Sequence, residues 1–294
     1  MKLAPECYDC LQRLICQAAT LATDDALLKQ RAIKEATKIL DENFSAEQLS
    51  IVIATKIHAM IKEVTHNPDP YRKMKDKEMT IAKELYLELS LRAEAASRRR
   101  GRKRSNLYKD DFGDCLRLAA AANAIDFFRE PGFIEEDIRK PVSFAIDDSE
   151  KFEARLKDAG EVLYLADNAG EIYFDLPLVK WMRQFAHVIY VVKPSPVQDD
   201  VTLEDIRKAG LESEFGAVIT TGIASPGIIF TLASDEFKKE FELADLIFAK
   251  GMGHYESLSE LPHEGNFFYC LMAKCKPVAR SLGVPINSYV AMLW

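Results

Sequence analysis

Polar side chains follow short apolar runs in the second half of the sequence, at the point where each run ends. Asp167 and Asn168 come directly after the run 162–166, and Asp199 and Asp200 come a few residues after the run 188–192. Carboxylate and amide oxygens favour hard divalent ions such as Mg²⁺ or Mn²⁺ over zinc. These residues therefore indicate a corner that binds a metal ion or a phosphate.

Two later runs end in groups that suit an anion. The run 217–219 is followed by the hydroxyls of Thr221 and Ser225 and by two glycines, and the run 246–248 is followed by Lys250 in front of a glycine loop. Two carboxylates cancel the charge of one dication, so a neighbouring lysine leaves a positive field for a phosphate. This is the charge arrangement of phosphoryl transfer.

Each of these features also has a purely structural explanation. Asp167 and Asn168 can cap the helix that follows them, and Lys250 can be a solvated loop residue. All four run ends carry such groups together, and this combination favours a functional site.

The elements that must position these residues are short buried strands. Helical stretches separate the apolar runs, an arrangement typical of parallel strands joined by crossover helices. Ligands collect at the carboxyl ends of the strands in such a sheet, so we expect the four run ends to meet. We predict an α/β fold class, with a Rossmann-like three-layer α/β/α domain over residues 146–294.

Residues 1–145 carry apolar side chains at helical spacing, so we predict a mostly helical domain in front of the α/β domain. Ser45 begins a capping-box pattern, which predicts that a helix starts there. Further helices are predicted over about 76–91 and 111–128.

Several motifs together resemble the damage-control phosphatase family, whose domain was formerly numbered among domains of unknown function and is also called acidic-residue methyltransferase-like. The similarity covers nearly the whole chain and rests on Cys-x-x-Cys at 7–10, Asn-Ala-Ile-Asp-Phe at 123–127, Asp-Asn-Ala-Gly-Glu at 167–171, Asp-Val-Thr at 200–202, Lys-Gly-x-Gly-x-Tyr-Glu at 250–256 and Lys-Cys-x-Pro-Val-Ala at 274–279. The combination is specific, although no single motif is.

The resemblance implies a metal-dependent phosphatase of the stand-alone prokaryotic type. It implies that Asp167, Asn168 and Asp200 hold a divalent ion (Mg²⁺, Mn²⁺, Co²⁺ or Ni²⁺) and that Lys250 contacts the phosphate. Glu171 is expected to support the ligands or to act as a general base. We expect the substrate to contact seven further residues: Asn123, Asp126, Thr221, Ser225, Gly251, Gly253 and His254.

The predicted function is hydrolysis of a small phosphorylated metabolite in a damage-control or housecleaning role. The Arg-Thr-x-Lys motif of the eukaryotic sugar-phosphate branch is absent, so the substrate class stays open. A sugar phosphate, a nucleotide and a phosphopantetheine-like compound all fit the prediction.

Two alternatives belong to other classes. An S-adenosylmethionine-dependent carboxyl methyltransferase is one, but the sequence lacks the glycine-rich loop that such a cofactor site needs. A non-enzymatic RNA-binding module is the other, using the basic segment from Arg98 to Arg104, which carries six cations in seven residues. Few aromatic residues accompany this segment, so nucleic acid is not the expected partner.

Composition agrees with a globular enzyme. The chain has 294 residues, of which 48% are hydrophobic and 29% charged, and its net charge is −7, which argues against a globally basic nucleic-acid binder. No stretch has the features of a signal peptide or a membrane span, so we expect a cytoplasmic protein with no membrane partner. A homo-oligomer is compatible with the sequence.

The six cysteines are too sparse for a disulfide scaffold, and we expect thiols or metal ligands. Cys7 and Cys10 form a Cys-x-x-Cys pair, but a structural zinc site needs four ligands. Cys270 and Cys275 could add ligands only if the two ends of the chain meet. The other explanation is a simple pair of helix residues.

Overall fold

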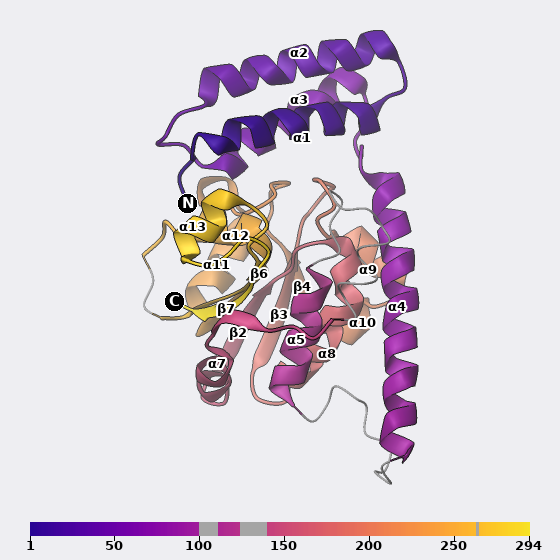
Figure 1. Ribbon diagram of the computed structural model, residues 1–294, viewed down its shortest axis with the longest axis vertical. Helices are drawn as coiled ribbons and strands as arrows, with labels where there is room; N and C mark the ends of the chain where they lie inside the picture. Colours follow the sequence, from indigo (N-terminus) through magenta and orange to yellow (C-terminus); the bar gives the residue numbers. More distant parts are fainter. Residues whose placement is uncertain (100–110, 124–139, 263–264) are drawn as a thin grey trace.

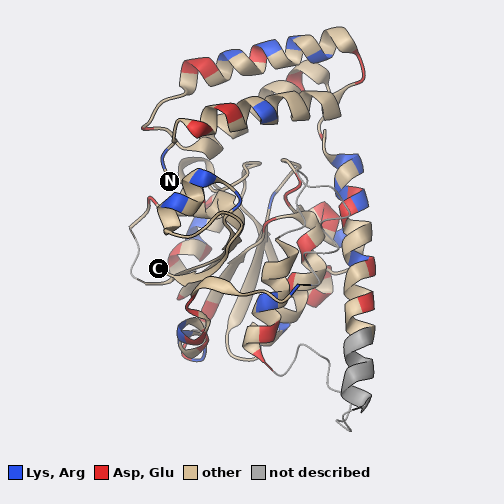
Figure 2. Cartoon of the chain, viewed as in Figure 1, with Lys and Arg blue, Asp and Glu red and all other residues tan. Residues whose placement is uncertain are grey.

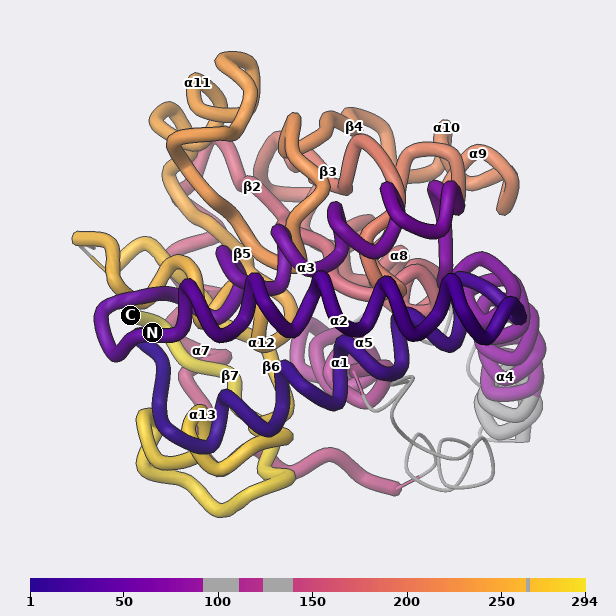
Figure 3. The backbone as a smooth tube through the Cα atoms, turned by 90° about the horizontal axis from the view of Figure 1, so that it is seen from above, coloured from indigo at the N-terminus to yellow at the C-terminus, as the bar shows by residue number. Residues whose placement is uncertain are grey.

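Three amphipathic helices at the start of the chain form a bundle with its own apolar core (Figure 1). They are α1 (Glu6–Ala22), α2 (Ala26–Asn43) and α3 (Ser50–Thr65). The bundle lies at one end of the molecule (Figure 1), and the view from above shows it crossing in front of the other elements (Figure 3). The computed structural model describes residues 1–99, 111–123, 140–262 and 265–294.

Helix α3 begins later than the sequence pattern indicates. Its first residue is Ser50 and its N-cap is Leu49, so the predicted helix start at Ser45 is wrong. The backbone before the helix is held in an extended bridge with the first residues of the chain, where the Leu3 N–H donates to the Gln48 carbonyl at 3.0 Å. This long-range pairing overrides the local capping pattern.

A seven-stranded sheet forms the centre of the second half, with the strand order β1-β7-β6-β5-β2-β3-β4. Strands β2 to β6 run parallel, whereas β7 runs antiparallel to β6 and parallel to β1. The strands are β1 (Phe144–Asp147), β2 (Glu161–Leu165), β3 (His187–Val192), β4 (Ala217–Thr220), β5 (Leu246–Lys250), β6 (Phe267–Met272) and β7 (Tyr289–Leu293).

Helices cover both faces of this sheet, which explains why its strands β2, β3, β5 and β6 are buried and apolar almost throughout. In β2, Val162 and Tyr164 pack into one core, and Leu163 and Leu165 pack into the core on the other face. The first core is shared with α4 (Arg72–Arg99), α5 (Phe112–Ala122), α7 (Ser149–Leu156), α8 (Ile172–Met182), α9 (Leu203–Ala209) and α10 (Glu212–Phe215). The second is shared with α11 (Asp235–Leu243), α12 (Gly251–Leu258) and α13 (Lys276–Leu282). The described residues also include two short 3₁₀ turns, η1 (Ala169–Glu171) and η2 (Phe230–Leu232).

The predicted α/β fold with a helical N-terminal region is confirmed. Helices α4 and α5 come from the predicted helical half, but they pack into the same core as the sheet. The domain boundary between residues 145 and 146 stays a prediction. The predicted helix over 111–128 is described as far as Ala122, with Asp111 as its N-cap, and residues 124–128 lie outside the described residues.

The order of the strands creates a switch point between β2 and β5. From β2 the chain adds β3 and β4 on one side, and then returns to place β5 on the other side of β2. At such a point the loops after adjacent strands diverge, which leaves room for a ligand at their carboxyl ends. The bundle covers this end, because Thr55 of α3 donates to the Ser225 hydroxyl at 2.9 Å and Lys62 donates to the Pro196 carbonyl.

Within the described residues, no helix combines the length and the apolar character needed to cross a membrane. Both acidic and basic residues occur along α2 and at the start of α4 (Figure 2). Of the basic segment predicted for the RNA-binding alternative, residues 100–104 lie outside the described residues.

Candidate active site

Two loops meet at the switch point and bring acidic residues together. The loop after β2 and the loop after β3 pair as a short antiparallel bridge between Asn168 and Asp200. On either side of the bridge, the Ala169 N–H donates to the Asp199 carbonyl at 2.8 Å and the Val201 N–H donates to the Asp167 carbonyl at 2.9 Å. Backbone hydrogen bonds therefore hold Asp167, Asn168 and Asp200 next to one another, as the sequence predicts.

The carboxyl groups of this pair of loops repel one another. Burial raises the pKa of Asp167 well above its usual range, and the negative charges of Glu171 and Asp200 raise it further. Burial also raises the pKa of Asp200 to about 6, although the Lys193 ammonium opposes the shift. An ionised carboxylate is unfavourable in such a place unless a cation joins it.

Asn123, at the C-terminal end of α5, orients two of these carboxylates. Its side-chain amide group donates to Asp167 Oδ2 and to Glu171 Oε1, both at 2.9 Å, while its own oxygen accepts from the Met272 N–H at 3.0 Å. Asn168 also donates to Glu171 Oε1 at 2.9 Å. Glu171 is thus held by two amides, one at the C-terminal end of α5 and one in the loop after β2.

Lys250, the last residue of β5, points into the protein behind the acidic loops. Its ammonium lies 2.6 Å from Glu171 Oε2 and 2.8 Å from Asp175 Oδ1, and it donates to the Ala119 carbonyl at 2.7 Å. Burial alone would lower its pKa, but the charges of Asp175 and Glu171 outweigh burial and raise it. Lys250 is therefore a cation, and the predicted contact with a phosphate stays a prediction.

Three residues of this network were not singled out from the sequence. Lys75 of α4 is fully buried, lies 2.7 Å from Asp205 Oδ2 and donates to the Asp200 carbonyl at 3.3 Å. Lys193, directly after β3, lies 3.4 Å from Asp200 Oδ2. Two of these residues could have been found from the sequence: Lys193 stands at a strand end, and Asp175 lies one turn after Glu171 in an apolar helix. Lys75 could not, because helical spacing alone does not distinguish it from a surface lysine.

Two predicted glycines allow close backbone approach. Gly251 has a φ of +77°, and a Cβ there would lie 1.9 Å from Asp167 Oδ2. A Cβ at Gly253 would lie 1.8 Å from the Pro226 carbonyl oxygen. A side chain at Gly251 would thus displace the Asp167 carboxylate, which gives the glycine after β5 a direct role in the shape of the site.

Three further predicted site residues, His254, Thr221 and Ser225, are buried. His254 donates from Nδ1 to the Lys250 carbonyl at 2.8 Å, and burial together with the charge of Lys193 lowers its pKa to about 3, so it is neutral. Thr221 donates to the Ile223 carbonyl at 2.8 Å, and Ser225 accepts from Thr55 of α3. Asp126 lies outside the described residues.

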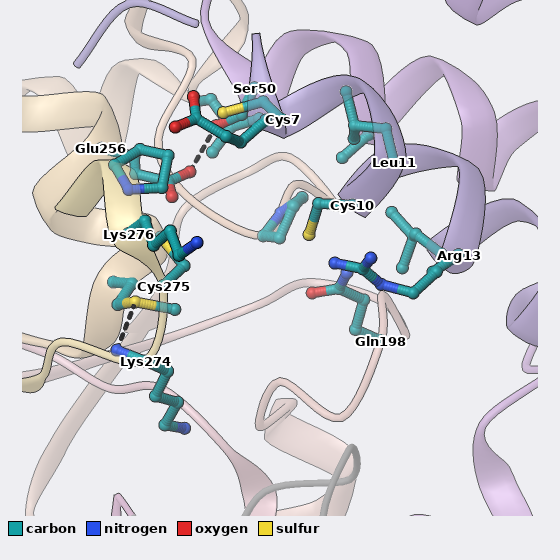
Figure 4. Close-up of a pocket in the computed structure, with 18 of the residues that line it drawn as sticks. Cys7, Cys10, Leu11, Arg13, Ser50, Gln198, Glu256, Lys274, Cys275 and Lys276 are labelled. Carbon is teal, nitrogen blue, oxygen red and sulfur yellow. Dashed lines mark hydrogen bonds between the residues drawn. The ribbon is translucent and has the colours of Figure 1, made fainter. Parts of the chain in front are cut away.

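A cleft of about 570 Å³ opens between the bundle and the acidic loops. Asp167, Asn168 and Asp200 line it on one side, and residues of α1 line it on the other. Figure 4 shows Arg13 and Leu11 of α1 facing the wall formed by Lys274 and Lys276. The cleft therefore combines carboxylates at one end with basic and apolar side chains around them.

Comparisons with known proteins identify the family of the chain. A family model described as the damage-control phosphatase ARMT1-like domain matches residues 3–290, and the chain belongs to this family. The phosphatase class predicted from the motifs is thereby confirmed at the level of the family.

Similar proteins match over their full length. The "Damage-control phosphatase" of Archaeoglobus fulgidus is 34% identical, with 99% of each chain covered. The "Damage-control phosphatase PH1575" of Pyrococcus horikoshii is 33% identical, with 99% of this chain and 98% of the relative covered. The crystal structure of that Pyrococcus protein, described as a DUF89 family protein, aligns with a TM-score of 0.84 at 31% identity and covers 100% of this chain and 99% of its own.

We predict that Asp167→Asn raises the thermal midpoint of the metal-free protein by several degrees at pH 7. Because the pKa of Asp167 is raised in the folded state, the folded protein binds this proton more tightly than the unfolded chain does. Its contribution to stability is therefore lost as the pH rises above the ordinary carboxyl value of 3.8. Thermal unfolding in EDTA at pH 5 and pH 8 measures how much the thermal midpoint changes with pH, and this change should be smaller in Asp167→Asn than in the wild type.

Asp205→Asn is the matched control. It removes a buried carboxylate that pairs with Lys75, so the unfolding free energy should fall by about 3 kcal/mol or more. Identical pH slopes for the wild type and Asp167→Asn would contradict the account of the acidic group.

Proposed function

We propose that this chain hydrolyses a small phosphorylated metabolite with the help of a divalent ion bound by Asp167, Asn168 and Asp200. The observation that carries the proposal is the pairing of two acidic loops at the switch point, which concentrates negative charge on the wall of a cleft. A dication is the ligand that relieves this repulsion.

The donor set fits a hard ion. The two carboxylates and the amide oxygen of Asn168 are the ligand types of Mg²⁺ and Mn²⁺ sites, and Co²⁺ and Ni²⁺ also accept them. Among the described residues, no three Cys, His, Asp or Glu side chains group together as metal ligands, so the amide oxygen would be the third protein ligand. When bound, such an ion polarises a phosphoryl oxygen and acidifies a water molecule.

Glu171 and Lys250 serve this site as positioning residues. Asn123 and Asn168 fix one oxygen of Glu171 and the Lys250 ammonium fixes the other, so Glu171 holds the two amides in place. Asn123 in turn orients Asp167. This network orders the carboxylates in advance, so their arrangement does not have to be organised when substrate arrives.

The substrate phosphate meets a different lysine in this proposal. Lys274 lines the cleft, and its positive charge acts on the Asp167 carboxyl and opposes the rise in pKa of that group. Arg13 and Lys276 line the same cleft. A phosphate next to Asp167 would therefore lie within the positive field of Lys274, whereas Lys250 lies against Glu171 and Asp175.

The cleft suits the organic part of a small metabolite. Its volume lies in the range of small-molecule sites, roughly 300–1,000 Å³. Leu11 and Leu14 of α1 and Ile51 and Ala54 of α3 give it an apolar wall. A sugar phosphate, a nucleotide and a phosphopantetheine-like compound are the substrates to compare.

The first test is a phosphatase screen of these three classes with Mg²⁺, Mn²⁺, Co²⁺ or Ni²⁺, each with and without EDTA. We expect activity that requires the metal, and a loss of about 100-fold or more in kcat/KM for Asp200→Ala because a ligand is removed. The control is Asp245→Ala at the opposite end of the sheet, where Asp245 accepts from the Gly160 N–H at 2.8 Å. Undiminished phosphate release in EDTA would contradict the proposal.

A second test compares two lysines. Lys250→Met leaves two buried carboxylates without their cation, so we expect the unfolding free energy to fall by about 3–5 kcal/mol. Lys274→Met should keep the stability and lower kcat/KM by about 30- to 1,000-fold, because it removes a charge offered to the phosphate. Denaturant unfolding and steady-state kinetics on both variants show which lysine contacts the phosphate. If Lys250→Met is as stable as the wild type and only its KM rises, the phosphate contact belongs to Lys250.

A further inference from the structure

Lys193, directly after β3, is a buried cation that stands unusually far from its carboxylate. Its ammonium lies 3.4 Å from Asp200 Oδ2, although both residues are almost fully buried. A close contact between an ammonium and a carboxylate measures about 2.7–2.9 Å, and the Lys250 ammonium lies 2.6 Å from Glu171 Oε2. Asp200 alone therefore does not determine where the Lys193 ammonium lies.

Two other acceptors share the Lys193 ammonium with Asp200. Lys193 donates to the carbonyl of Gly227, in the loop after β4, at 3.2 Å. Its ammonium also lies 3.5 Å from Nε2 of His254, in the first turn of α12. An ammonium has three N–H bonds, so these three acceptors match its donors in number. Groups from three separate segments thus hold the charge of Lys193 in place.

The contacts of His254 determine which ring nitrogen faces Lys193 with a lone pair. His254 Nδ1 lies 2.8 Å from the Lys250 carbonyl, which can only accept, so Nδ1 carries the ring proton. In a neutral ring the lone pair is then on Nε2, the atom that faces Lys193. His254 therefore connects the end of β5 to Lys193, as a donor on one side and an acceptor on the other.

We propose that His254 is a positioning residue that holds the Lys193 ammonium back from Asp200 and so keeps Asp200 available to a divalent ion. An ammonium in close contact with Asp200 would occupy an oxygen that the ion needs, and it would neutralise the charge that attracts the ion. At 3.4 Å the Lys193 charge still lowers the cost of burying Asp200. This role rests on the proposed function, because it concerns the ion that Asp200 would bind.

The buried position of His254 favours this role over a direct contact with substrate. The ring is 2% exposed, and each of its two nitrogens faces a protein group. The substrate contact predicted from the sequence would require the ring to leave these partners. Without the His254 acceptor, the Asp200 carboxylate is the strongest acceptor near the Lys193 ammonium, so we expect the ammonium to move toward it.

The test is Mn²⁺ binding to the metal-free, full-length protein, followed by electron paramagnetic resonance of the free ion. His254→Leu keeps an apolar side chain of moderate size but has no acceptor, so we expect its Mn²⁺ affinity to fall by about 10-fold. His254→Gln restores an acceptor oxygen on a longer side chain and should bind like the wild type. Tyr255→Phe is the matched control on the same helix and should also bind like the wild type, because it loses only the hydrogen bond of 2.8 Å to the Ser281 hydroxyl.

A double-mutant cycle shows whether His254 acts through Lys193. Lys193→Met removes the competing cation, so His254→Leu should have no further effect on Mn²⁺ affinity in that background. The inference is overturned if His254→Leu binds Mn²⁺ like the wild type, or if its effect is the same with and without Lys193. If Lys193→Met does not fold, the two His254 variants decide, and equal losses in His254→Gln and His254→Leu overturn the inference.

Failure of the proposed function gives a different result. A wild type that binds no Mn²⁺, or an Asp200→Ala variant that binds it unchanged, contradicts the proposed metal site and this inference together. A wild type that binds Mn²⁺ and shows the expected His254 effects, but releases no phosphate from any substrate, contradicts the phosphatase proposal alone.

Discussion

Repulsion among buried carboxylates at the carboxyl ends of β2 and β3 is the constraint on which the rest of this structure depends. Buried charges are costly unless they are paired, and the cost of one isolated carboxylate amounts to several kcal/mol. Three fully or almost fully buried lysines from separate elements compensate this group: Lys75 of α4, Lys193 after β3 and Lys250 of β5.

The positions of these lysines explain features of the fold that are distant from the cleft. Lys75 ties α4 to the loop that carries Asp200 and to the capping box at the start of α9, so this helix is part of the site's support. Lys250 joins β5 to α8 and α5. Asp167 lines the cleft and accepts a hydrogen bond from the neutral amide of Asn123, a contact that leaves its charge available to a ligand.

The sequence predicts those parts of this arrangement that depend on local pattern. Buried parallel strands appear as continuous apolar runs, and the residues after them lie at the sheet edge where ligands bind, so position alone placed Asp167 and Asn168 near the carboxylates of Asp199 and Asp200. The choice of Asp200 from this pair came from the resemblance to the family. The start of α3 could not be predicted in the same way, because pairing with the first residues of the chain decides it. The partners of Lys250 and the burial of Lys75 also depend on tertiary packing, which local spacing does not encode.

The measurement that tests the central claim most directly is a crystal structure of the Mn²⁺-soaked protein with data collected on both sides of the manganese absorption edge. The account predicts an anomalous peak bonded to oxygens of Asp167, Asn168 and Asp200, with the contacts of Lys250 to Glu171 and Asp175 unchanged. A manganese peak elsewhere in the cleft, or none at these residues at saturating Mn²⁺, would contradict it.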